Sequence, residues 1–209
     1  MRTRLLLAIT ALSMAVVAGC TTTSEGVPLP GSNATTKPSL DDPSTDDGLP
    51  SDGAPKVENP LDVSRFEQKP CDALTSQQTK ELNVPLAGEQ KGDSLGETCY
   101  WRNSQTRGSV SLSLLSGDER GLSSLYREAE GKVFPYFESI DDIEGHPAMA
   151  FNTTEAKPTI ECGVGVGVTD KLALLVLVGL SDARIGNRDP CEAATQVAGM
   201  AMKTMKEAA

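Results

Sequence analysis

The stretch IECGVGVGV, residues 160–168, carries the most regular pattern in the chain. Cys162 and the valines that follow it alternate with Glu161 and three glycines. Because successive side chains of a strand point to opposite faces, this pattern predicts a β-strand with one valine face and one glycine face. The turn-like pair at 170–171 and the apolar run 172–180 predict a second, largely buried strand that pairs back on the first.

Hydrophobic periodicity predicts further strands and helices before and after these two strands. The strands are expected from Cys99 onward and over residues 109–114, 137–143 and 148–151. The helices are expected over residues 75–82, where Thr75 and Gln78 fit a capping box, over 122–133, and from Pro190 onward with Asp189 as the cap. We therefore expect an α+β fold, an antiparallel sheet with helices packed on it, stapled by two disulfides.

Four cysteines are expected to form those disulfides: Cys71, Cys99, Cys162 and Cys191. An even number of cysteines in an exported chain is typical of a disulfide framework, and the absence of any C-x-x-C spacing argues against a metal site. Cys162 lies on the predicted valine face, and Cys191 lies on the inward stripe of the last predicted helix. This placement favours Cys162 with Cys191 and Cys71 with Cys99, while the two other pairings remain open.

The N-terminal residues have the features of a lipoprotein signal peptide. Arg2 and Arg4 precede an apolar run over residues 5–17, which is too short to span a bilayer but suits a secretory signal. The run ends in Ala-Gly immediately before Cys20, an arrangement that resembles the bacterial lipobox. We expect residues 1–19 to be removed and Cys20 to carry a diacylglyceryl anchor with acyl chains such as palmitate. The alternative is a plain secreted protein with an accidental cysteine.

A polar spacer is predicted between the anchor and the folded domain. Residues 20–65 contain seven prolines, many serines and threonines, and no apolar periodicity, so we expect a disordered tether followed by a single domain over residues 66–209. Removal of the signal changes the formal charge from −10 to −12, because two arginines are lost. Such an acidic chain is a poor candidate for binding nucleic acid or anionic lipid headgroups, so the acyl anchor must hold it at the membrane.

His146 is the only histidine of the chain, and acidic residues flank it. Together with Asp141, Asp142 and Glu144, it could form a metal or acid–base site. A lone histidine beside a proline in a turn is more often a turn residue, so we expect no site, no cofactor and no metal here.

The glycines and the tryptophan are the remaining candidates. Gly163, Gly165 and Gly167 fall inside a strand, which excludes a phosphate loop. They are expected to let a helix or a neighbouring backbone approach closely, with a groove for an extended apolar or glycan ligand as the alternative. Trp101 shares a strand face with Cys99, so we expect it to pack in the core against a disulfide; the alternative is a sugar-stacking platform.

Several short motifs occur in an order that resembles a known family. They are PCDALT at residues 70–75, CYW at 99–101, GHPA at 145–148, the alternating valines after Cys162, and DPC at 189–191. Together with the lipobox they are similar to small actinobacterial lipoproteins that carry the domain of unknown function 3558, over about residues 60–207. The resemblance implies a cell-envelope lipoprotein of a high-GC Gram-positive bacterium and carries over no catalytic residues. The glycine-rich run departs from the bulkier alternation expected of this family.

The sequence thus predicts a lipid-anchored protein on the extracytoplasmic face of the cell membrane. We expect a non-enzymatic binding module whose partner is an envelope protein, a glycan or a lipid, and not a nucleic acid. One alternative is a carrier of an apolar envelope lipid, which would need a cavity of several hundred Å³ between the sheet and the helices. The other is an enzyme of cell-wall metabolism, for which no catalytic pattern is found.

Overall fold

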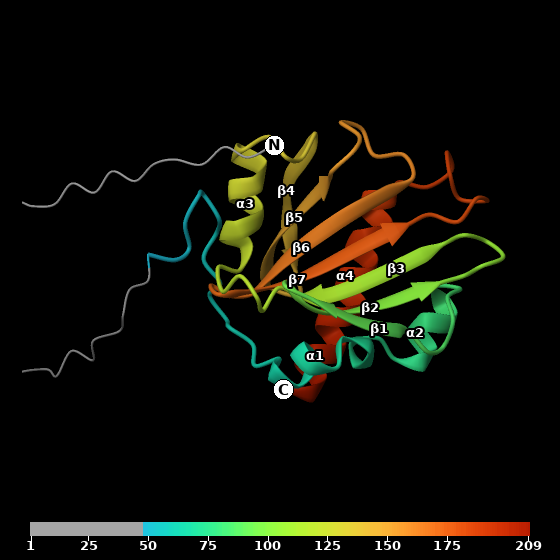
Figure 1. Ribbon diagram of the computed structural model, residues 1–209, viewed down its shortest axis with the longest axis horizontal. Coiled ribbons are helices and arrows are strands. Elements are labelled where there is room, and N and C mark those ends of the chain that lie inside the picture. The colour runs from blue at the N-terminus through green and yellow to red at the C-terminus, as the bar shows by residue number, and fades with distance from the viewer. Residues whose placement is uncertain (1–47) are drawn as a thin grey trace, which may run out of the picture. The chain divides into compact units, whose positions relative to one another are not determined.

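A computed structural model describes residues 48–209, and within them the fold is α+β, as the sequence predicts (Figure 1). The seven strands form one antiparallel sheet in the order β1-β2-β3-β7-β6-β5-β4. The strands are β1 (Glu89–Asp93), β2 (Gly96–Arg102), β3 (Ser109–Leu114), β4 (Tyr136–Ile143), β5 (His146–Asn152), β6 (Glu161–Thr169) and β7 (Leu172–Gly179). The helices are α1 (Ser64–Gln68), the 3-10 helix η1 (Pro70–Ala73), α2 (Ser76–Glu81), α3 (Leu122–Glu130) and α4 (Pro190–Ala208).

The valine face of β6 packs against α4, which crosses behind the sheet in Figure 1. The β6 valines and the α4 residues Ala194, Ala198, Ala201, Met202 and Met205 are fully buried. Asp189 caps this helix as predicted, since its Oδ1 accepts hydrogen bonds from the backbone N–H groups of Cys191 at 2.7 Å and Glu192 at 3.2 Å. The patterned stretch therefore forms the contact between sheet and helix around which the core is built.

The glycine face of β6 is covered at one end by α3. A Cβ atom on Gly165 would lie 2.5 Å from Leu125 Cδ1, and one on Gly167 would lie 3.1 Å from Leu122 Cδ1. A side chain at either position would collide with these leucine side chains of α3 unless they moved. The prediction that the glycines allow a helix to approach closely is therefore confirmed for this end of the strand.

Residues 48–65, which the sequence assigned to the tether, lie against the domain. Val57 and Val63 are buried, and the backbone N–H of Leu61 donates to the Val168 carbonyl at 3.1 Å. The Val57 N–H also donates to Asp170 Oδ1 at 2.9 Å. The few apolar residues here are spaced by polar residues and prolines, so they show no periodicity although they add to the core. The signal peptide, Cys20 and tether residues 20–47 lie outside the described residues.

Several elements differ from those expected. Strand β1 was not predicted, because its sequence EQKGD is polar, as suits an edge strand. The turn before β5 consists of Glu144 and Gly145, both with positive φ, so His146 belongs to the strand. Helix α3 ends at Glu130 because Lys132 adopts a positive φ of 60°, and Val133 is therefore 51% exposed instead of joining the apolar stripe.

Both disulfides have the favoured pairing. Cys71 is joined to Cys99 and Cys162 to Cys191, with Cα–Cα distances of 5.1 and 4.9 Å. The first joins η1 to β2, and the second joins β6 to the first turn of α4. Within residues 48–209, no helix combines the length and the apolar character required to cross a bilayer.

Candidate binding face

The side of the sheet opposite α4 is only partly covered. α3 and the segment around Val57 cover the β6 glycines at one end, and the other end, across β2, β3, β7 and β6, carries no helix (Figure 1). Two cross-strand rows form the uncovered surface, which we call the open face. The first row is Tyr100, Ser111, Leu177 and Gly163, and the second is Arg102, Ser109, Gly179 and Glu161.

Large apolar side chains stand exposed on the open face. Tyr100 is 41% exposed and Leu177 is 43% exposed, although both belong to inner strands of the sheet. They border a recess of about 460 Å³, whose wall is continued by Leu175 and Phe151. Volumes of this size are typical of sites that hold small ligands or a segment of a larger one.

Small side chains form the floor between these walls. Ser109 and Ser111 lie on β3, with Tyr100 on the neighbouring strand β2 and Leu177 on the neighbouring strand β7. Strands are spaced by about 4.8 Å, so the two walls rise from backbones about 10 Å apart. We call Ser109 and Ser111 the serine floor. Among residues 48–209, no group hydrogen-bonds to either hydroxyl, so both can bind a ligand.

The rim of the recess carries two cations and two anions. Lys91 Nζ lies 3.1 Å from Glu89 Oε1 and 5.8 Å from the centre of the Tyr100 ring. Arg102 and Glu161 occupy the two ends of the second row. The formal charges of these four side chains cancel, so the recess is locally neutral.

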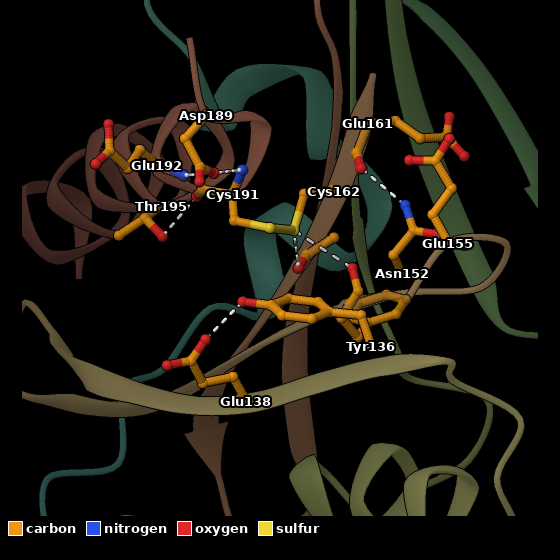
Figure 2. The surroundings of a disulfide bond; sticks show 12 residues. Tyr136, Glu138, Asn152, Glu155, Glu161, Cys162, Asp189, Cys191, Glu192 and Thr195 are labelled. Carbon is orange, nitrogen blue, oxygen red and sulfur yellow. Dashed lines mark hydrogen bonds between the residues drawn. A yellow bond between two sulfur atoms is a disulfide. The ribbon is translucent and has the colours of Figure 1, made fainter. Parts of the chain in front are cut away.

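A second recess lies beside the Cys162–Cys191 disulfide and is lined by Tyr136, Glu138 and Asp189 (Figure 2). The Tyr136 hydroxyl donates to Glu138 Oε2 at 2.6 Å. Burial, followed by this hydrogen bond and the negative charges of Glu138 and Asp189, raises the pKa of Tyr136 to about 12. A phenol with so high a pKa stays protonated near neutral pH, so it is poorly suited to act as a base or a nucleophile there.

The other polar groups of Figure 2 have structural roles. Asn152 donates from Nδ2 to the Glu161 carbonyl at 2.8 Å, and its Oδ1 accepts from the Thr154 N–H at 2.7 Å. These contacts tie the end of β5 to the start of β6. Thr195 donates to the Cys191 carbonyl at 2.9 Å inside α4. These hydrogen bonds thus fix β5 to β6 and the first turns of α4, and the Cys162–Cys191 disulfide joins β6 to α4.

His146 lies in the strand and is buried. Its Nδ1 lies 2.9 Å from the Gly167 carbonyl on β6, and the side chain is only 3% exposed. The flanking acids Asp141, Asp142 and Glu144 are exposed. Within the described part of the chain, no group of three or more histidine, cysteine or acidic side chains is placed to hold a metal ion.

Trp101 packs in the core, and its neighbour Tyr100 is the exposed aromatic residue. Trp101 is 1% exposed, and a Cβ atom on Gly88 would collide with both its ring and Cys99 Sγ. The predicted packing beside a disulfide is thus confirmed. Alternation along β2 was the signal that could have identified Tyr100, since it places this residue on the face opposite Trp101.

Comparison with known proteins identifies a family. A family model described as "Protein of unknown function (DUF3558)" matches residues 15–204 of the chain. No curated protein and no solved structure matches it.

Proposed function

The chain belongs to the DUF3558 family of proteins of unknown function, and we propose that it is a lipid-anchored extracytoplasmic module that binds a partner on its open face. The observation that carries the proposal is the exposure of Tyr100 and Leu177 on inner strands of a sheet whose other face is covered by α4 over its central strands β6 and β7. Soluble domains normally cover the apolar faces of their sheets with a second layer. A partner supplies that layer here.

The anchor is supported by the sequence around Cys20 and by the two disulfides. Disulfides form and persist in oxidising compartments outside the cytoplasm, where a lipoprotein of this kind would reside. The other four cysteines are all bonded to one another, which leaves Cys20 as the one thiol for lipid. These features support a location on the extracytoplasmic face of the cell membrane.

A binding role is favoured over catalysis by the composition of the open face. The hydroxyls of the serine floor would need a neighbouring base to act as nucleophiles, and histidine is the usual one. The single histidine, His146, is buried in β5 with its Nδ1 on the Gly167 carbonyl. The serine floor is therefore suited to hydrogen bonding with a ligand.

Transport of a lipid inside the domain is the less favoured function. It would need a cavity between the sheet and the helices, but Val164, Val176 and Met202 fill the space between the sheet and α4 and are fully buried. The recess of about 460 Å³ lies on the other side of the sheet and is open to solvent. This arrangement favours a partner bound at the surface.

Substitution of Cys20 tests the anchor. We expect Cys20→Ala to move the protein from the detergent phase to the aqueous phase in a detergent partition experiment, because it removes the site of the acyl chains. Metabolic labelling with palmitate should mark the unchanged protein and not the variant. A Cys20→Ala protein that still partitions with detergent and carries the label would contradict the anchoring.

Substitution of Leu177 tests the open face. We expect a component that co-purifies with the protein from its own membrane, seen by native mass spectrometry, to be lost in Leu177→Asp, because a carboxylate would be buried without a partner in the contact. The matched control is Val133→Asp, since Val133 is also about half exposed but lies beyond the end of α3. Equal retention of every component by the two variants would count against the proposal.

A further inference from the structure

We infer that the open face binds a neutral, extended glycan chain along the serine floor. The inference rests on the proposed function and adds the chemical class of the ligand. It is carried by three features of the recess: an exposed aromatic ring, a floor of hydroxyls without partners, and a rim whose charges cancel.

The walls of the recess suit the apolar faces of sugar rings. Tyr100 is 41% exposed and carries a large, flat ring, and Leu177 faces it across the serine floor. An aromatic ring buries much apolar area at a small cost in conformational entropy, because it has few rotatable bonds. Sugar rings present C–H groups on their faces and hydroxyls around their edges. A sugar ring on edge between these walls would place C–H groups against Tyr100 and hydroxyls against β3.

The serine floor distinguishes a glycan from an acyl chain or an apolar helix. A ligand that covers Ser109 and Ser111 removes water from two hydroxyls that have no partner within residues 48–209. An apolar ligand would leave both hydroxyls unsatisfied, and each such group weakens the contact substantially. The hydroxyls of a glycan can donate to and accept from both serines. The chemistry of the floor thus favours a polyhydroxylated ligand.

The charges around the recess favour a ligand without charge. Lys91 is paired with Glu89 at 3.1 Å, and the formal charges of Arg102 and Glu161, at the two ends of the second row, cancel. The domain as a whole is acidic, since residues 48–209 contain 16 Lys and Arg against 24 Asp and Glu, a formal charge of −8. An anionic polymer would be repelled by this excess, and a cationic one would be drawn to the acidic surfaces outside the recess. A neutral chain avoids both effects.

The shape of the recess supports an extended chain. The serine floor runs along β3, and Gly179 on the neighbouring strand adds a position without a side chain. Arg102 and Glu161 border the second row on its two sides, so each can bind the hydroxyls of a further sugar unit. A chain of several sugar units can therefore follow the strand direction.

Titration of the full-length lipoprotein with defined oligosaccharides tests the inference. The probes are neutral hexasaccharides of glucose, mannose, galactose and arabinose, with hexagalacturonate as the anionic control, measured by isothermal titration calorimetry in a detergent that contains no sugar. We expect at least one neutral hexasaccharide to bind and hexagalacturonate not to bind. Failure of every neutral hexasaccharide, or equal binding of hexagalacturonate, overturns the inference.

Variants place the bound glycan on the open face. We expect Tyr100→Ala to weaken binding about tenfold or more and Tyr100→Phe to retain it, because the ring and not the phenol supplies the stacking surface. Ser111→Leu should abolish binding by filling the floor, whereas an apolar ligand would bind this variant as well or better. Val133→Ala is the control outside the recess, and thermal unfolding checks that each variant is folded. Unchanged glycan binding by Tyr100→Ala or Ser111→Leu overturns the inference.

The outcome separates this inference from the proposed function. A membrane component that depends on Leu177 but contains no sugar would overturn the glycan inference and leave the binding module intact. If no component depends on Leu177, both the binding module and the glycan inference are overturned.

Discussion

Replacing Cys162 and Cys191 together by alanine should lower the free energy of unfolding by about 3–4 kcal/mol. The disulfide closes a loop with a sequence separation of 29 residues, and the chain-entropy model gives a cost of about this size for a loop of this length. It also joins β6 to the first turn of α4, the two elements whose contact builds the core. Urea denaturation, followed by circular dichroism, measures the change.

A control separates the covalent link from the helix cap beside it. Asp189→Ala leaves the disulfide in place and removes the side chain that caps α4, so we expect a loss of only about 1 kcal/mol. If the double cysteine variant loses no more than Asp189→Ala, the disulfide does not stabilise the contact between β6 and α4 as described. Since single domains are usually stable by about 5–15 kcal/mol, the double cysteine variant should still fold at 25 °C.

Gly163→Val is expected to destabilise the domain by about 1–3 kcal/mol, the usual cost of overpacking. A Cβ atom on Gly163 would lie 2.4 Å from two ring carbons of Phe151 and 2.8 Å from Leu177 Cδ2. The ring cannot yield easily, because Phe151 is itself buried and lies 4.6 Å, between centroids, from Phe134. The midpoint of urea denaturation should fall with an unchanged slope.

Gly179→Val is the matched control for this change. Gly179 lies on the same face of the next strand, but the nearest atom to a Cβ there is the Ser109 hydroxyl at 2.7 Å, and the one after it is 4.0 Å away. A serine side chain can rotate, and valine favours strands, so we expect a change of less than about 1 kcal/mol. Equal losses for the two variants would show that the cost comes from replacing glycine in the sheet and not from the contact with Phe151.

Much of the fold follows from the sequence because the core is regular. The alternation over residues 160–168 predicts the central strand, and the apolar stripe after Asp189 predicts the face of α4 that covers it. The same two periodicities place Cys162 and Cys191 near each other, which favours the disulfide that is found. These elements owe their structure to repeated local patterns, which a sequence displays directly.

The remaining parts depend on tertiary contacts that have no local pattern. Strand β1 is an edge strand with a polar sequence. The segment around Val57 is held by hydrogen bonds from the Val57 N–H to Asp170 and from the Leu61 N–H to the Val168 carbonyl. Alternation could place Tyr100 opposite Trp101, but it could not show which part of that face α3 would leave uncovered. Helix α3 stops where Lys132 adopts a positive φ, a property of the backbone that composition does not reveal.

Photo-crosslinking from position 177 in intact cells that make the protein tests the central claim most directly. A photoreactive amino acid replaces Leu177 on the open face, or Val133 as the equally exposed control beyond α3. If the open face binds a partner, irradiation should give a discrete adduct from position 177 that position 133 does not give. No adduct from position 177, or the same adducts from both positions, would contradict the claim.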